Sequence, residues 1–307
     1  MKILITGGAG FIASHIADAY IKLGHDVVII DNLSTGFEEN INPKAKFYKL
    51  DITSPEIIEV FEKEKFDIIS HHAAQMNVRF SVENPIIDSN INILGSLNLY
   101  EAAVKTGVKK VIFASTGGAV YGETDIIPTP ETTELRPCSP YGISKLTNEK
   151  FLFYYNQVYN LDYTILRYAN VFGSRQNPQG EAGVVAIFIN KMLSREQPII
   201  NGDGLYTRDY IHISDVVGAN ILSLNDNKPN IYNIGTGIET TTNEIFRIIK
   251  NSINADCSEV HGEAKKGEQR RSCISYKKIK QELNWEPKVS LEQGIKETVD
   301  FFRNKNL

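Results

Sequence analysis

Short apolar runs alternate with segments of helical periodicity along the first half of the chain. The apolar runs have the length of buried strands and fall at Lys2–Thr6, Asp26–Ile30, Lys46–Leu50, Asp67–His71, Lys110–Ala114 and Tyr163–Arg167. Helical spacing lies between them, at Phe11–Leu23, Pro55–Glu64, Ile86–Lys105 and Pro140–Tyr159. This alternation predicts an α/β fold with a doubly wound parallel sheet, covered by helices on both faces.

The pattern loosens beyond Asn170, where Gly, Pro and Asn become more frequent. We expect loops at Gly173–Gly183, Asn201–Thr207 and His261–Gln269. The change predicts one domain over residues 1–170 and a smaller lobe over 171–307. The boundary between them is soft, and the chain can cross from one to the other.

A glycine turn joins the first predicted strand to the first predicted helix. Gly7 permits a tight turn, and Gly10 lets the backbone approach a pyrophosphate at the helix N-terminus. Ala13 takes the third small position of this Rossmann-type motif. Asp31 ends the second strand at the place where a carboxylate accepts a hydrogen bond from the 2′-hydroxyl of NAD and repels the extra phosphate of NADP. The first half is therefore predicted to bind NAD.

A second motif opens the helix predicted at Pro140–Tyr159. Ser139 is placed to cap this helix, and Tyr141 and Lys145 follow on one face, a turn apart. The neighbouring ammonium and the helix N-terminus both favour a phenolate at Tyr141. Thr116 ends the strand that begins at Lys110, so its hydroxyl can converge on the same substrate oxygen. These three residues are the predicted catalytic group.

Composition limits the possible partners. The chain has 307 residues, with 33 Lys and Arg, 37 Asp and Glu, and a net charge of −4. This balance gives no sign of nucleic-acid binding, and no apolar run reaches the length of a membrane span. The cysteines Cys138, Cys257 and Cys273 are too far apart for a metal motif or a disulfide framework. We expect a cytoplasmic protein without a bound metal.

The chain resembles the extended short-chain dehydrogenases/reductases, and among them the nucleotide-sugar 4-epimerases, with the UDP-glucose 4-epimerases as the nearest group. The resemblance covers nearly the whole chain. It is carried by Thr6–Ala13, Asp31–Gly36, Asp51-Ile52, His72–Gln75, Asn92, Ser115–Gly122, Tyr141–Lys145, Arg167–Gly173, Gly180–Val185, Thr207–His212 and Gly267–Ser272. Ala13 stands where a glycine is more usual, and Thr116 where many relatives have serine.

The resemblance implies two sets of binding residues. Those expected to hold NAD are Gly7, Gly10, Phe11, Ile12, Asp31, Asn32, Leu33, Ser34, Thr35, Gly36, Asp51, Ile52, His72, Ala73, Ala74, Gln75, Asn92, Ser115, Tyr141, Lys145 and Tyr168. Those expected to hold a UDP-sugar are Thr116, Asn170, Val184, Arg208, Tyr210, Arg270 and Ser272. Arg208 and Arg270 are expected on the diphosphate. The helices at Ile86–Lys105 and Pro140–Tyr159 are expected to pair with those of a second copy in a homodimer.

The implied reaction is the 4-epimerisation of a UDP-hexose, UDP-glucose or UDP-galactose, with retained NAD. Tyr141 would take the proton of the 4-hydroxyl while C4 passes hydride to NAD, and the 4-keto sugar would rotate before hydride returns. Related dehydratases follow the strand-end hydroxyl with Asp-Glu, whereas here Gly117-Gly118-Ala119 follow Thr116.

Other functions stay open. By the resemblance, Ser272 stands where a bulky aromatic residue in some relatives excludes N-acetylated sugars, so UDP-N-acetylglucosamine is an alternative substrate, and UDP-glucuronate is another. A 4-keto-sugar reductase that releases its cofactor and a catalytically silent NAD-binding regulator are alternatives of a different class. A reductase would not retain its cofactor, and a regulator would not need Thr116, Tyr141 and Lys145 together.

Overall fold

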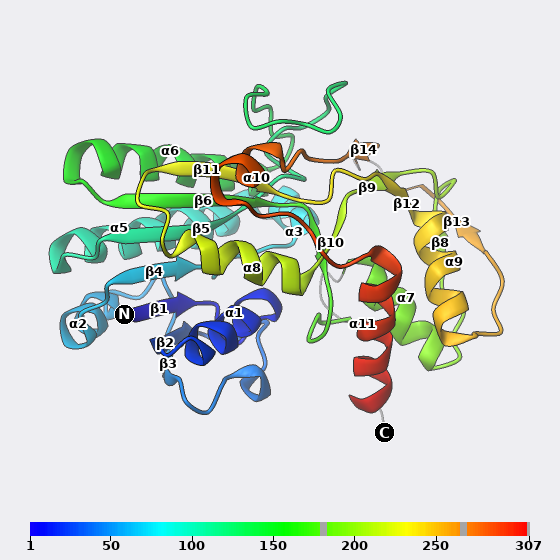
Figure 1. The fold of residues 1–307 in the computed structure, drawn as a ribbon, viewed down its shortest axis with the longest axis horizontal. Helices are drawn as coiled ribbons and strands as arrows, with labels where there is room; N and C mark the ends of the chain where they lie inside the picture. Colours follow the sequence, from blue (N-terminus) through cyan, green and yellow to red (C-terminus); the bar gives the residue numbers. More distant parts are fainter. Residues whose placement is uncertain (179–182, 265–268, 306–307) are drawn as a thin grey trace.

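The computed structural model describes residues 1–178, 183–264 and 269–305, and its central feature is a parallel sheet of seven strands (Figure 1). The strand order is β11-β6-β5-β4-β1-β2-β3. The strands are β1 (Lys2–Thr6), β2 (Asp26–Asp31), β3 (Lys46–Lys49), β4 (Ile68–His71), β5 (Lys110–Thr116), β6 (Asp162–Tyr168) and β11 (Asn230–Ile234). The predicted doubly wound α/β fold is confirmed.

Helices cover both faces of this sheet. On one face lie α1 (Phe11–Lys22) and α8 (Ile213–Ser223), and on the other α2 (Ile57–Glu64), α5 (Gly95–Thr106) and α6 (Pro140–Tyr159) (Figure 1). Successive residues of one strand enter different cores, since Ile3 packs with the α1 side and Leu4 with the α5 side. This two-sided burial explains why the strands are nearly continuous apolar runs.

The helix expected at Ile86–Lys105 is interrupted. The structure has α4 (Pro85–Ser89), a π-helical turn η2 (Asn90–Leu94) and then α5. A further helix, α3 (Val78–Glu83), precedes them and is capped by the Asn77 side chain, which accepts from the Phe80 amide at 2.5 Å. Between β2 and β3 lies the short 3₁₀-helix η1 (Glu38–Asn40).

The second part of the molecule is built around three helices with a shared apolar core. They are α7 (Val184–Leu193), α9 (Thr242–Ile253) and α11 (Leu291–Lys305). Short strands surround them: β7 (Asn170–Phe172) pairs with β10 (Tyr210–His212), β9 (Thr207–Arg208) lies between β12 (Thr240–Thr241) and β14 (Arg271–Ser272), and β8 (Ile200–Asn201) pairs with β13 (His261–Gly262). The chain crosses the boundary expected at residue 170, because α8 and β11 return to the large sheet, and α10 (Lys277–Leu283) packs beside β11.

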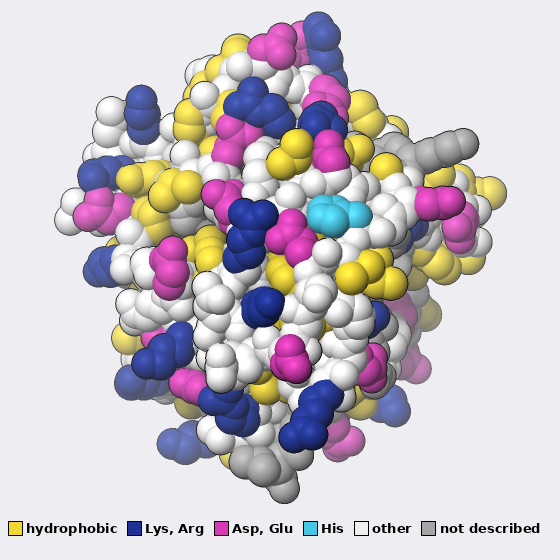
Figure 2. All heavy atoms as spheres, turned by 90° about the vertical axis from the view of Figure 1, so that its right-hand side faces the viewer, with side chains coloured by type: hydrophobic (Ala, Val, Ile, Leu, Met, Phe, Trp, Pro, Cys, Tyr) yellow, Lys and Arg dark blue, Asp and Glu magenta, His cyan; other side chains and the backbone are white. Residues whose placement is uncertain are grey.

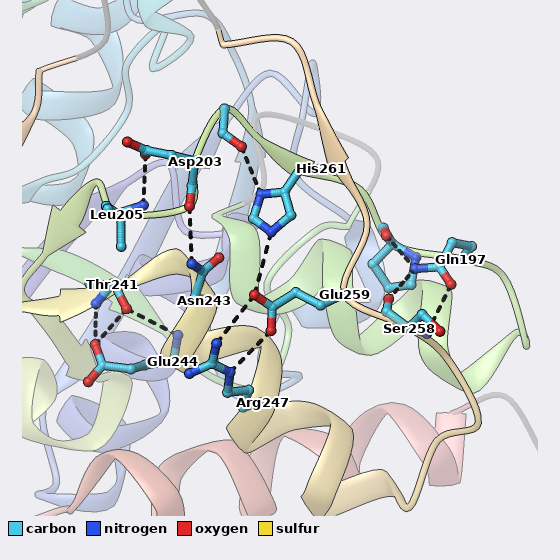
Figure 3. Close-up of polar contacts among 12 residues, drawn as sticks. Gln197, Asp203, Leu205, Thr241, Asn243, Glu244, Arg247, Ser258, Glu259 and His261 are labelled. Atoms are coloured by element: carbon cyan, nitrogen blue, oxygen red, sulfur yellow. Dashed lines mark hydrogen bonds and ion pairs between the residues drawn. The ribbon is translucent and has the colours of Figure 1, made fainter.

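The loop that leads into β9 is tied to its neighbours. The Asn243 side chain donates to the Asp203 carbonyl at 3.1 Å, and the Leu205 amide donates to the Asp203 carboxylate at 2.9 Å (Figure 3). His261 Nδ1 donates to the Gly202 carbonyl at 2.8 Å. These hydrogen bonds hold the loop in place. Strand β9, which carries Arg208, follows directly after this loop. Figure 2 shows acidic and basic side chains interspersed over this face of the second part.

No helix within the described ranges is both long and apolar enough to cross a membrane.

Candidate active site

The glycine turn after β1 leaves space that a side chain would fill. Gly7 has a φ of +71°, and a Cβ on it would lie 2.8 Å from the Ala73 amide nitrogen. A Cβ on Gly10 would lie 3.1 Å from the Gly7 carbonyl oxygen. Helix α1 begins at Phe11, followed by Ile12, with Gly10 as its N-cap and no capping side chain. The residues present therefore fit the pyrophosphate of a dinucleotide, which uncapped helix amides bind well.

Asp31 lies directly beside this turn. Its carboxylate accepts from the Ala9 amide at 3.0 Å and from the Leu33 amide at 2.8 Å, one bond at each oxygen. Each oxygen keeps a lone pair for a ribose hydroxyl. The segment from Asn32 through Ser34 and Thr35 to Gly36 then folds over the turn, where a Cβ on Gly36 would lie 2.8 Å from that of Ala9.

Asp51 is brought next to this segment. Its carboxylate accepts from the Asn32 side-chain amide at 2.6 Å and from the Thr53 amide at 2.8 Å. Burial opposes ionisation, but these hydrogen bonds together hold the pKa of Asp51 below its ordinary value. Ile52 is buried, with its side chain facing Gly95. Asp31, Asn32 and Asp51 thus lie at one end of the predicted cofactor site.

The segment after β4 is anchored through its backbone. The Thr6 hydroxyl oxygen accepts from the His72 and Ala73 amides at 3.2 and 3.1 Å. The Asn92 side chain accepts from the Gln75 amide and donates to the Gln75 carbonyl, both at 2.8 Å. Ala74 lies between these anchors. Asn92 was expected to lie along the cofactor. Its side chain holds the 72–75 segment, which would itself border the cofactor.

His72 and Tyr168 form a stacked pair at the floor of this region. Their ring centres are 6.3 Å apart with planes 11° from parallel. Burial lowers the pKa of His72 to about 3, so its ring is neutral, and its buried Nδ1 atom has no hydrogen-bond partner. The Asn220 side chain donates to the Tyr168 hydroxyl at 2.9 Å. The two rings thus stack on each other where β4 and β6 end.

Helix α6 begins as predicted. The Ser139 hydroxyl oxygen accepts from the Gly142 amide at 3.1 Å, with Pro140 as the first helical residue. Lys145 is buried, and its Nζ atom lies 5.8 Å from the centre of the Tyr141 ring. The same ammonium donates to the Ala114 carbonyl at 2.9 Å. Burial lowers the pKa of Lys145 to about 8, and the charge of Asp88 opposes that shift.

Three of the predicted substrate residues meet around Gly118. A Cβ on Gly118 would lie 3.8 Å from Thr116 Oγ1, 3.8 Å from Ser272 Oγ and 3.9 Å from Asn170 Oδ1. Two hydroxyls and an amide, from β5, β7 and β14, thus lie together around Gly118. Polar groups of this kind can bind a sugar, and we call them the candidate pocket around Gly118.

The predicted anchors for the nucleotide lie in the second part. Arg208 on β9 is paired in register with Ser272 on β14, which joins the anchors to the pocket around Gly118. Tyr210 is buried, and burial raises the pKa of its phenol. Arg270 donates to Asp203 at 3.1 Å and lies over the Tyr206 ring, and its other guanidinium donors could bind a diphosphate.

Val184 begins α7 and has no described contact with the other anchors. Residues 180–182 of the Gly180–Val185 motif and residues 267–268 of the Gly267–Ser272 motif lie outside the described residues.

A buried ion pair behind the site was missed by the sequence reasoning. Arg167 donates to Glu149 through Nε at 3.0 Å and through a terminal nitrogen at 2.5 Å, and to the Tyr121 hydroxyl at 2.8 Å. The Ser115 hydroxyl donates to Glu149 at 2.6 Å. The Ser115 side chain therefore faces this ion pair, and only its backbone is left for the cofactor contact expected of it. The sequence signal that could have indicated this ion pair is Glu149, an acidic residue one helical turn after Lys145 on α6.

Comparisons with known proteins identify relatives over the whole length of the chain. The model of a family described as "NAD dependent epimerase/dehydratase family" matches residues 3–235. The UDP-glucose 4-epimerase of Mycolicibacterium smegmatis is 39% identical over 312 residues, covering 100% of both chains. A UDP-glucose 4-epimerase from Thermotoga maritima, solved with UDP-glucose, superposes with a TM-score of 0.99 at 48% identity over 100% of both chains. One from Thermus thermophilus, solved with NAD, gives a TM-score of 0.94 at 40% identity over 99% of both chains.

Proposed function

Because the chain belongs to the NAD dependent epimerase/dehydratase family, we propose that it is a UDP-hexose 4-epimerase that interconverts UDP-glucose and UDP-galactose with bound NAD. The observation that carries this proposal is the buried Lys145, whose Nζ atom lies 5.8 Å from the centre of the Tyr141 ring, in a chain whose first glycine turn fits a dinucleotide. The relatives solved with UDP-glucose and with NAD support the same pairing of ligands.

In the proposed site, NAD supplies a reversible hydride acceptor for C4 of the sugar. Gly7, Gly10 and the first amides of α1, Phe11 and Ile12, would hold its pyrophosphate, and Asp31 would bind a ribose hydroxyl. The 32–36 and 51–52 segments would border the adenosine. The 72–75 segment, fixed by Asn92, and the ring of Tyr168 would border the other half.

The acid–base work falls to side chains of this chain. Tyr141 would remove the proton of the sugar 4-hydroxyl and return it after the sugar has turned. The Thr116 hydroxyl would hold the 4-oxygen. Lys145, charged at neutral pH and buried, would stabilise the Tyr141 phenolate and bind the ribose nearest the reacting ring.

A 4-epimerase must turn its sugar while keeping the nucleotide fixed. We assign the nucleotide half of the substrate to Val184, Arg208, Tyr210 and Arg270, whereas Asn170 lies with Thr116 and Ser272 around Gly118. The pocket around Gly118 offers hydroxyl and amide groups but no charged side chain among the three that border it, so it would hold the sugar weakly enough to allow rotation. Gly117 and Ala119 offer no acid or base for the elimination that a dehydratase performs.

The space beside Ser272 favours UDP-N-acetylglucosamine as a second substrate, because a small hydroxyl residue leaves room for an acetamido group. Incubation with UDP-glucose, UDP-N-acetylglucosamine and UDP-glucuronate separately, without added cofactor, tests both proposals. Chromatography should show the galacto epimer from UDP-glucose. Absence of that epimer, also after NAD is added, would contradict the assignment. Formation of an epimer from UDP-glucuronate alone would instead identify a carboxylated sugar as the substrate.

We also propose a homodimer formed through α4 and α6. Exposed apolar side chains lie on both of these helices, which pack against each other, and an apolar patch of this kind marks an interaction surface; they are Ile86 (83% exposed), Ile87, Phe153 (55% exposed) and Tyr154. A hollow of about 490 Å³ lined by Thr147, Lys150, Phe151 and Tyr154 lies on the same helix as Phe153. Light scattering should give twice the chain mass for the wild type and the single mass for Phe153→Glu.

We place the enzyme in the cytoplasm. Its cysteines Cys138, Cys257 and Cys273 are all free thiols, which is the usual state in a reducing compartment.

A further inference from the structure

Asp88 on α4 is a fully buried carboxylate next to the catalytic helix. One of its oxygens accepts from the side-chain amides of Gln75 at 2.9 Å and Asn92 at 3.0 Å. Its other oxygen accepts from the Ser144 hydroxyl at 2.6 Å. Asp88 therefore joins the predicted cofactor segment, the π-helical turn and α6 at one point.

The three groups that donate hydrogen bonds to Asp88 are all neutral, so none of them supplies a positive charge to pair with its carboxylate. Ser144 is followed on α6 by Lys145, which is also buried and donates to a neutral carbonyl, that of Ala114. Two opposite charges thus lie on the facing helices α4 and α6, each bonded to neutral groups. Charges in such surroundings attract one another more strongly than in water, because little solvent screens them.

Other titratable groups near Lys145 do not supply this counter-charge. His71 and His72 face it from β4, and burial lowers the pKa of both, so both are neutral at pH 7. On α6 itself, Glu149 is paired with Arg167, and Tyr141 lies toward the substrate side of the helix in the proposed mechanism. On β5 the ammonium faces two uncharged groups, the Phe113 ring and the Ala114 carbonyl.

The π-helical turn accounts for part of this arrangement. Asn92 lies within η2, where its carbonyl accepts from the side chains of Ser96 and Asn148, both at 2.7 Å. Its side-chain amide is then free to bind Asp88 and the Gln75 backbone. Turns of this kind are frequent at functional sites.

We propose that Asp88 is a positioning residue of the epimerase reaction, whose charge keeps Lys145 as an ammonium and whose hydrogen bonds hold the 72–77 segment against α6. The proposal rests on the proposed function for its catalytic meaning, but the charge state of Lys145 can be measured without turnover. Loss of the Asp88 charge should release the Lys145 proton at lower pH, and should reduce the rate wherever the ammonium is lost.

The test is Asp88→Asn, which has the same shape. Its oxygen can still accept from Gln75 and Asn92, and its new amide can donate to the Ser144 hydroxyl, which also accepts. With ¹³C at lysine Cε, the Lys145 resonance can be assigned by its absence in Lys145→Arg. We expect this resonance to titrate at lower pH in Asp88→Asn than in the wild type, because the charge that favours the ammonium is gone. The alkaline fall of the epimerisation rate should move in the same direction.

Ser144→Ala is the matched control, because it removes a hydrogen bond but keeps the carboxylate. Its Lys145 titration should stay within a few tenths of a pH unit of the wild type. If Asp88→Asn fails to fold, Asp88→Ser removes the same charge with a smaller side chain. A folded neutral variant in which Lys145 titrates as in the wild type would overturn the proposal. Failure of the wild type to convert any UDP-hexose would instead count against the proposed function.

Discussion

The Nζ atom of Lys145 lies 5.8 Å from the centre of the Tyr141 ring, one turn away on the same helix. This relationship places a buried cation beside the phenol that must accept a proton. It also depends on the Ala114 carbonyl at the end of β5, which accepts from the ammonium at 2.9 Å. A helix and a strand that are distant in sequence therefore fix the geometry of the proposed acid–base pair.

The charge of Lys145 predicts an alkaline limit to activity. Burial lowers its pKa to about 8, so the ammonium is present at neutral pH and is lost as the pH rises through that value. The epimerisation rate should fall above about pH 8. In Lys145→Arg the guanidinium stays charged, so the fall should vanish or move to higher pH even if the enzyme is slower. An unmoved fall in Lys145→Arg would show that another group causes it.

The lowered pKa of Lys145 also predicts how this residue affects the free energy of unfolding at different pH values. Its pKa is lower in the folded protein than the ordinary 10.5, so between about pH 8 and 10.5 the unfolded chain binds more protons. The contribution of this residue to the free energy of unfolding should therefore rise with pH across that window. Urea unfolding of the wild type and of Lys145→Met, compared at pH 7.5 and about pH 10, measures this difference. A gap between the two proteins that does not change with pH would contradict it.

The glycine turn predicts a specific loss of NAD in Gly7→Ala. The new Cβ would lie 2.8 Å from the Ala73 amide nitrogen, so the turn or the 72–75 segment must shift. Gly24 is a matched control, because its φ of +84° is similar but no atom lies within 4 Å of its Cβ position. Both variants should be strained by about 1–2 kcal/mol. Only Gly7→Ala should be purified without NAD, and equal NAD content in both would contradict this assignment.

The buried ion pair predicts a large effect on stability. Arg167→Met leaves the Glu149 carboxylate buried without its partner, which should lower the free energy of unfolding by about 3–5 kcal/mol. The exposed pair of Arg136 and Glu134, with a distance of 2.6 Å, is the control, and Arg136→Met should change the free energy of unfolding little. Urea unfolding of both variants tests this. Similar losses in the two would show that burial of the pair is not the cause.

The pocket around Gly118 predicts a change of substrate range in Ser272→Tyr. A bulky ring would occupy the space next to Thr116 and Asn170 that an acetamido group needs. Turnover of UDP-N-acetylglucosamine should fall far more than turnover of UDP-glucose. Ser272→Ala should keep the ratio of the two rates near that of the wild type. Equal losses for both sugars in Ser272→Tyr would mean that Ser272 does not border the acetamido position.

Capping and proline signals in the sequence predicted helix bounds well, because these bounds depend on neighbouring residues. The helix at Pro140–Tyr159 was predicted to the residue, and a capping serine followed by a proline marks its start. The break between α4 and α5 was not predicted, since the Asn92 carbonyl is satisfied by side chains from Ser96 and Asn148, and the second of these comes from another helix.

Buried polar groups were the least predictable part of the site. Arg167 stands in an apolar strand and Asp88 in a short helix, and nothing local indicates that each has a partner on α6. Strand β11 was also missed, because it joins the large sheet through contacts with β6 that are distant in sequence. The residues around Gly118 could be suggested by resemblance, but only folding shows that Thr116, Asn170 and Ser272 border one space.

The central claim is that Tyr141 moves the proton of the sugar 4-hydroxyl, and Tyr141→Phe tests it most directly. This variant keeps the ring and removes only the hydroxyl. The rate of UDP-glucose epimerisation should fall by about 10²–10⁴-fold, the range for loss of a general base. Bound NAD and the melting temperature should stay near those of the wild type. A folded, NAD-bound Tyr141→Phe enzyme that turns over at the wild-type rate would contradict the account.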